Sequence, residues 1–72
     1  MSTNGTYDHL TTGQLIRQIR RRLNITQKQL AEKAGIHMQT VWNAENNMPM
    51  RTSTLDKICD AFTKEINDKT KT

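Results

Sequence analysis

The chain is poor in the residues that build disulfides, metal clusters and membrane spans. Its 72 residues include one cysteine, Cys59, so an internal disulfide and a cysteine zinc cluster are both excluded. No apolar stretch approaches the roughly 18 residues of a membrane span. The N-terminus also lacks the basic and apolar segments of a signal peptide. We therefore expect a cytoplasmic protein in a reducing compartment, without a membrane partner.

The residues of common active sites are equally scarce. Two histidines are too few for a convincing metal site, and their spacing supports no Ser-His-Asp or Cys-His arrangement. Cys59 lies in an apolar helical pattern, where a small core residue is more common than a nucleophile. We expect no enzyme activity, no cofactor and no small-molecule substrate.

Chain length and net charge indicate the number of domains and the kind of partner. A chain this short forms one small domain and buries only about 60% of the surface that its unfolded form exposes. The formal net charge is +4, and residues 1–33 hold six basic and two acidic residues. Such a basic half favours a polyanion such as nucleic acid as the partner. Ordinary solubility would explain the charge equally well.

Two helix starts are marked by the spacing of capping boxes, at Thr11 with Gln14 and at Thr26 with Gln29. Apolar residues recur at helical spacing after both. The apolar face of the first helix consists of Leu15, Ile16, Ile19 and Leu23. The polar residues expected to point elsewhere are Arg17, Gln18, Arg21 and Arg22.

A tight turn is expected at Gly35, because glycine adopts positive φ without steric penalty and lets a helix stop abruptly. His37 is the expected N-cap of a third helix that runs from Met38 to about Asn46. The inward residues of this helix are Val41, Ala44 and Glu45. The outward residues are Met38, Gln39, Trp42 and Asn43.

The last helix follows Pro49, which prevents the third helix from continuing. Thr52 or Ser53 can cap it, and its expected apolar stripe is Leu55, Ile58, Cys59 and Phe62. We expect a flexible lead over residues 1–10, a helical domain over 11–66 and a disordered polar tail over 67–72. The predicted fold is all-α and compact, with four helices and an optional short fifth.

Residue types spread over all four expected helices form a wider pattern. They are Ile16, Ile19, Arg20, Thr26, Gln27, Leu30, Ala31, Ala34, Gly35, Ile36, Val41, Glu45, Asn46, Leu55 and Phe62. This pattern resembles the helix-turn-helix domain of the Cro and phage-repressor (XRE) family, and the resemblance covers roughly residues 13–62. It implies a lambda-repressor-like fold with double-stranded DNA as the partner.

The resemblance also implies roles for individual residues. Gln39 is the strongest base-contacting candidate, since an amide pairs bidentately with adenine in the major groove. Gln27, Asn46 and Arg51 match phosphate-contacting positions, and Gln27 begins a helix, whose N-terminus attracts anions. The complete set expected to contact DNA is Gln27, His37, Met38, Gln39, Thr40, Trp42, Asn43, Asn46 and Arg51.

Arg20 and Glu45 match a pair that forms a largely buried salt bridge in several family members. Removing one partner of such a pair leaves an unpaired buried charge. Arg20 is therefore expected to be structural rather than a phosphate contact.

The chain departs from the family pattern in two places. Its third helix contains no Arg or Lys, so the common bidentate contact to guanine is absent. An apolar rim that could bind a protein consists of Met38, Trp42, Met48 and Met50. In the alternative, Trp42 packs onto the core or stacks at the groove edge. Residues 64–72 are also too polar for a good fifth helix, so we expect a weak homodimer at most.

These features resemble a small phage Cro-like regulator acting in a bacterial host cell. The expected function is transcription regulation in a lysis–lysogeny switch. The chain is also similar to the modulator-of-repression, or antirepressor, type. In that alternative it binds the phage immunity repressor through the helix-turn-helix face and blocks or alters its DNA binding.

Overall fold

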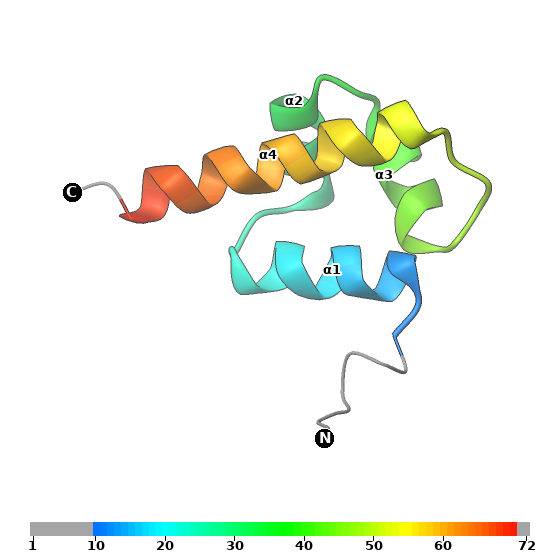
Figure 1. Ribbon diagram of the computed structural model, residues 1–72, viewed down its shortest axis with the longest axis horizontal. Coiled ribbons are helices and arrows are strands. Elements are labelled where there is room, and N and C mark those ends of the chain that lie inside the picture. Colours follow the sequence, from blue (N-terminus) through cyan, green and yellow to red (C-terminus); the bar gives the residue numbers. More distant parts are fainter. Residues whose placement is uncertain (1–9, 71–72) are drawn as a thin grey trace.

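The computed structural model describes residues 10–70, and this part of the chain is all-helical (Figure 1). The helices are α1 (Thr12–Arg22), α2 (Gln27–Ala34), α3 (Met38–Glu45) and α4 (Thr52–Thr70). The predicted all-α fold with four helices is therefore confirmed. No fifth helix follows within the described residues. Of the expected flexible lead, residues 1–9 lie outside this range.

Both predicted capping boxes are present. The hydroxyl of Thr11 accepts a hydrogen bond from the Gln14 N–H (3.2 Å), and the Gln14 side chain accepts one from the Thr11 N–H (2.9 Å). Thr26 and Gln29 repeat this exchange at 3.0 and 2.8 Å. Each exchange satisfies two backbone donors that an uncapped helix start leaves free. Local sequence therefore sets where α1 and α2 begin.

The turn between α2 and α3 has the predicted left-handed residue. Gly35 has φ 70° and ψ 35°, and the N–H of Ile36 donates to the Ala31 carbonyl (3.0 Å). His37 follows as the N-cap of α3 with extended backbone, but its side chain forms no capping hydrogen bond. Thus α3 begins where predicted, although the imidazole of His37 does not hold its first turn.

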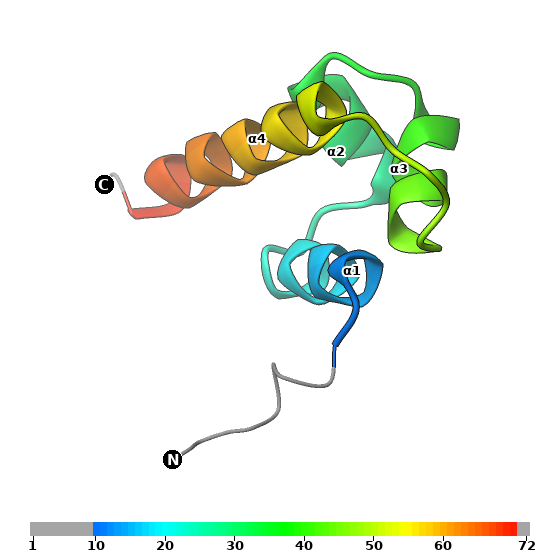
Figure 2. The same ribbon diagram turned by 45° about the vertical axis from the view of Figure 1, so that its right-hand side comes forward.

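The core lies where α2 contacts both α3 and α4, with α1 packed against α3 (Figures 1 and 2). Its buried apolar residues are Ile16, Ile25, Leu30, Ala31, Val41, Ala44, Ile58, Ala61 and Phe62. The remaining predicted apolar residues of α1, Leu15, Ile19 and Leu23, are half-buried. The side of α3 that was expected to face inward, Val41, Ala44 and Glu45, is buried.

The buried stripe of α4 differs from the predicted one. It consists of Ile58, Ala61, Phe62 and Glu65, whereas Cys59 is exposed and Leu55 is half-buried. Both stripes have helical spacing around Ile58 and Phe62, so periodicity alone did not distinguish them. The expectation that Cys59 is a core residue was wrong, because α4 turns Ala61 and not Cys59 toward the core.

The last turns of α4 are held by charge rather than by apolar packing. Glu65 is buried, and its carboxylate lies 2.9 Å from Lys33 Nζ on α2 and 3.6 Å from Lys69 Nζ. The hydrogen bond and charge of Lys33 hold the pKa of Glu65 below its ordinary value. Residues 67–70 of the expected disordered tail form the end of α4, and residues 71–72 lie outside the described part of the chain. Within residues 10–70, no helix is both long enough and apolar enough to cross a membrane.

Candidate nucleic-acid interface

The outer surface of α3 carries two parallel rows of side chains. Residues four positions apart are neighbours along a helix, so Met38 and Trp42 form an apolar row, while Gln39 and Asn43 form an amide row beside it. Met38 is 53% exposed and Trp42 is 46% exposed. Gln39 is exposed and Asn43 is half-buried. The alternative in which Trp42 packs onto the core is therefore wrong.

The two amides are already connected. Gln39 Nε2 donates a hydrogen bond to Asn43 Oδ1 (3.1 Å). A primary amide has two N–H donors and a carbonyl acceptor. Gln39 thus keeps its second N–H and its Oε1 for another partner, and Asn43 keeps its Nδ2 donors. The bond orders both side chains on the outer surface without using up their capacity to bind.

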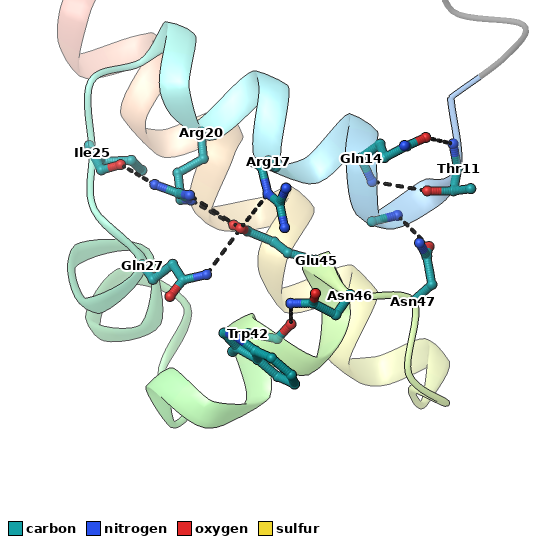
Figure 3. A network of polar contacts seen from close by, with 11 residues as sticks. Thr11, Gln14, Arg17, Arg20, Ile25, Gln27, Trp42, Glu45, Asn46 and Asn47 are labelled. Carbon is teal, nitrogen blue, oxygen red and sulfur yellow. Dashed lines mark hydrogen bonds and ion pairs between the residues drawn. The ribbon is translucent and has the colours of Figure 1, made fainter.

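The inner surface of α3 is fixed by the carboxylate of Glu45, whose side chain is fully buried (Figure 3). Arg20 of α1 binds this carboxylate through two bonds, Nε to Oε2 (2.6 Å) and Nη2 to Oε1 (3.2 Å). Its Nη1 donates to the Ile25 carbonyl (3.0 Å) in the loop before α2. The ion pair expected between Arg20 and Glu45 is therefore present, and it also ties down the loop.

Gln27 and Arg17 complete the network around the same carboxylate. Gln27 Nε2 donates to Glu45 Oε1 (3.1 Å), and Arg17 Nε lies 3.5 Å from that oxygen. Arg17 was expected to point away from the apolar face; instead it turns toward α3, and its side chain stays 41% exposed. Its contact is long, so Arg20 and Gln27 provide the main bonds. One carboxylate thus joins α1, α2 and α3.

The network also sets the charge state of Glu45. Burial would raise the pKa of this carboxyl group, but the hydrogen bonds from Arg20 and Gln27, the charge of Arg20 and the contact of Arg17 together outweigh burial. The pKa of Glu45 is therefore below its ordinary value. Glu45 is charged at neutral pH, and both of its carboxylate oxygens accept hydrogen bonds inside the domain.

The side-chain amides of two residues expected to contact phosphates already form hydrogen bonds inside the domain. The Gln27 amide binds Glu45, and Asn46 Nδ2 donates to the Trp42 carbonyl at the end of α3 (2.8 Å). Each amide nitrogen retains a second N–H. An anion could therefore bind these side chains only through the donor that remains, or through the backbone at the start of α2.

The other residues expected to contact DNA or a protein partner differ in their exposure to solvent. His37 and Arg51 are exposed and Thr40 is half-buried. Among the four residues of the expected apolar rim, Met48 is 49% exposed, but Met50 packs against the core. The exposed part of the expected rim thus consists of Met38, Trp42 and Met48.

A close contact between α1 and α3 was not predicted from the sequence. A Cβ on Gly13 would lie 2.5 Å from the Glu45 carbonyl oxygen and 2.6 Å from that of Ala44. The Gly13 N–H donates to Oδ1 of Asn47 (3.0 Å), a residue with φ 60°. Glycine in the first turn of a well-capped helix is unfavourable by itself. An unfavourable glycine at this position is the sequence signal that could have predicted the close contact between α1 and α3.

Residues 16–68 match the Cro/C1-type HTH DNA-binding domain. This match includes most of α1, the whole of α2 and α3, and all but the end of α4. The chain belongs to this family. No curated protein and no solved structure matched the chain in two further comparisons.

As a Cro/C1-type DNA-binding domain, the chain contains a helix-turn-helix formed by α2, the Gly35 turn and α3. The Glu45 network lies on the inner side of this unit, and the two rows of α3 lie on its outer side. Among the described residues, no group of three or more His, Cys, Asp or Glu residues could hold a metal ion.

Proposed function

We propose that this Cro/C1-type domain regulates transcription by placing α3 in the major groove of double-stranded DNA and binding a specific sequence. The observation that carries the proposal is the pair of hydrogen-bonded amides, Gln39 and Asn43, on the outer surface of α3. A helix fits the major groove, about 12 Å wide, and amide side chains bind base edges there. The Glu45 network supports this role because it holds α3 at one orientation.

Contacts to the DNA backbone would come from residues around α3. His37, Thr40 and Arg51 are at least partly accessible, and Gln27 and Asn46 each retain one amide N–H. The N–H groups at the start of α2 add a favourable site for a phosphate. Without a stable dimer, a single domain should bind one half-site weakly and with strong salt dependence.

A band-shift titration tests this proposal. The wild-type chain is titrated at low salt against DNA flanking its own gene and against random DNA of equal length. The proposal predicts preferential binding to the flanking DNA. Equal binding to the two would contradict it.

The biological setting that we propose is the lysis–lysogeny switch of a phage in its bacterial host. A homodimer would add affinity by placing two α3 helices on two half-sites about one helical turn apart. We expect this dimer to be weak, and analytical ultracentrifugation across a concentration series would detect it.

A second candidate function is favoured by the exposure of Met38, Trp42 and Met48. Met and Trp commonly serve as anchors in protein–protein interfaces. In this alternative, the chain is an antirepressor that binds a phage immunity repressor through the outer surface of α3. Such binding would compete with DNA for the same surface.

Co-purification with the neighbouring repressor distinguishes this alternative. Trp42→Ala should reduce capture of the repressor, whereas Ile66→Ala should not. Ile66 is a matched control because it is also 46% exposed and lies on α4. Equal capture by Trp42→Ala and the wild type would exclude the outer surface of α3 as the repressor-binding site.

A further inference from the structure

We infer that the DNA bound by α3 is rich in A·T pairs, with adenine edges bound by the amide row and thymine methyl groups covered by the apolar row. This inference rests on the proposed function, because it requires α3 to enter the major groove. It adds the class of base pair that the outer surface of α3 recognises.

The partners for G·C pairs are missing from α3. Guanine is bound most often by Arg or Lys through O6 and N7, and Met38–Glu45 contains neither. Cytosine N4 is bound by Asp or Glu, and the sole acidic residue of α3 is Glu45. Its side chain is fully buried and bound by Arg20. No charged group on α3 is therefore available to select G·C.

The groups that bind adenine are present and accessible. Adenine offers an N6 donor and an N7 acceptor in the major groove. Gln39 retains a carbonyl oxygen and one N–H after its bond to Asn43, which are the two groups that a bidentate contact needs. The bond to Asn43 also restricts the Gln39 side chain, so less conformational entropy is lost on binding.

The apolar row fits the other half of the same base pair. Thymine presents its C5 methyl group in the major groove, beside the adenine edge of its pair. Met38 and Trp42 expose apolar surface directly beside the amide row. The two rows on α3 thus offer one kind of group for each half of an A·T pair.

DNA explains this mixed surface better than an apolar protein partner does. An apolar partner that covered Met38 and Trp42 would also bury the amides of Gln39 and Asn43. Buried amides without partners are unfavourable. Base edges of A·T pairs offer apolar and hydrogen-bonding groups together, so both rows are satisfied at once.

The test begins with selection of bound duplexes from a random library by the wild-type chain. The enriched duplex is then prepared in two modified forms. Deoxyuridine in place of thymidine removes only the methyl group, and 7-deazaadenine removes the N7 acceptor. Neither change alters Watson–Crick pairing.

We expect an enriched core of A·T pairs. Each methyl group covered by Met38 or Trp42 should contribute about fourfold in affinity, so uracil substitution should weaken binding by about that factor per contacted thymine. Loss of N7 at the adenine bound by Gln39 should weaken binding by about fivefold or more.

Two variants connect the methyl effect to α3. Met38→Ala should bind the thymine duplex more weakly than the wild type does. Its affinity should also be the same whether the base next to residue 38 is thymine or uracil. Ile66→Ala, which removes a comparable exposed apolar side chain from α4, should keep the full response. Thermal melts of both variants should match the wild type because both residues are exposed.

The outcomes separate the two levels of the proposal. If no sequence is enriched over random DNA, the proposal of sequence-specific binding is wrong, and the inference of A·T recognition is wrong as well. If the enriched core is rich in G·C, or if uracil duplexes bind as well as thymine duplexes, DNA binding stands and the A·T inference alone is overturned. The inference holds if uracil at the thymine next to Met38 lowers affinity in the wild type and in Ile66→Ala but not in Met38→Ala.

Discussion

Arg20 Nε lies 2.6 Å from Glu45 Oε2, so the charged group of α1 holds the last residue of α3. The same guanidinium binds the loop carbonyl of Ile25, and the same carboxylate binds Gln27 at the start of α2. This ion pair and its hydrogen-bond partners therefore connect three helices. Because α3 has only eight residues, this pair is important for presenting its outer surface.

Glu45→Gln should destabilise the domain by about 3–5 kcal/mol, because it leaves the Arg20 guanidinium without its charged partner in a largely buried position. A domain of this size has a total free energy of unfolding of only about 4–11 kcal/mol. Urea denaturation measures the loss. The control is Asp60→Asn, which breaks the exposed ion pair with Lys64 and should cost less than about 1 kcal/mol. Equal losses in the two variants would contradict the role of Glu45.

Stability should fall in acid because the pKa of Glu45 is lower in the folded chain than its ordinary value of 4.5. The folded state binds this proton less readily than the unfolded state. The ion pair therefore stabilises the fold above the unfolded pKa, and this contribution is lost as pH falls through the folded pKa. Thermal melts between about pH 6 and pH 2 measure the loss.

The acid response has an internal control. Glu65, whose pKa is also lowered, contributes in the same direction. Glu45→Gln should therefore reduce the pH dependence without abolishing it, and adding Glu65→Gln to this variant should reduce it further. A pH profile that is unchanged in Glu45→Gln would show that the network does not titrate as described.

Gly13→Ala should destabilise the domain by about 1–3 kcal/mol, because the added methyl group would overlap the backbone carbonyls of Ala44 and Glu45. Gly35→Ala should cost about 1–2 kcal/mol for a different reason. Apart from Gly35 and its two chain neighbours, no atom of the described residues lies within 4 Å of the added Cβ, but φ at Gly35 is +70°. Gly35→Asn should recover part of this loss, since asparagine tolerates positive φ, whereas Gly13→Asn should not. Rescue at both sites would contradict the steric account of Gly13.

Gln39→Ala should weaken binding to the preferred duplex by about 1–3 kcal/mol and leave binding to random DNA nearly unchanged. The amide contacts bases, whereas non-specific binding depends on phosphate contacts. Fluorescence anisotropy with both duplexes measures the two affinities. Asn67→Ala, which removes an exposed amide from α4, is the control and should change neither. An equal loss on both duplexes would place Gln39 at the backbone instead of at the bases.

Much of the helical framework could be predicted because its signals are local. Thr11 with Gln14, Thr26 with Gln29, and Gly35 each specify a helix end within a few residues, and the structure has all three. The inward side of α3 also followed from spacing alone. Family resemblance rather than local pattern predicted the pair of Arg20 and Glu45.

The features that were missed depend on contacts between distant segments. Burial of Glu65 requires Lys33 of α2, and the turn of Arg17 toward α3 requires Glu45. Periodicity fits two faces of α4, so only tertiary packing decides that Cys59 is exposed. Helical spacing placed Trp42 on the outward side of α3, where the structure exposes it, but left open whether its ring folds back onto the core.

The most direct test of the central claim uses Trp42, the sole tryptophan of the chain, which lies on the outer surface of α3. Its fluorescence is recorded while the selected duplex is added, and the same samples are followed by anisotropy of labelled DNA. If α3 enters the major groove, the emission of Trp42 should change with the same midpoint as the anisotropy. Saturable DNA binding with unchanged Trp42 emission would contradict the claim, because the duplex would then lie away from α3.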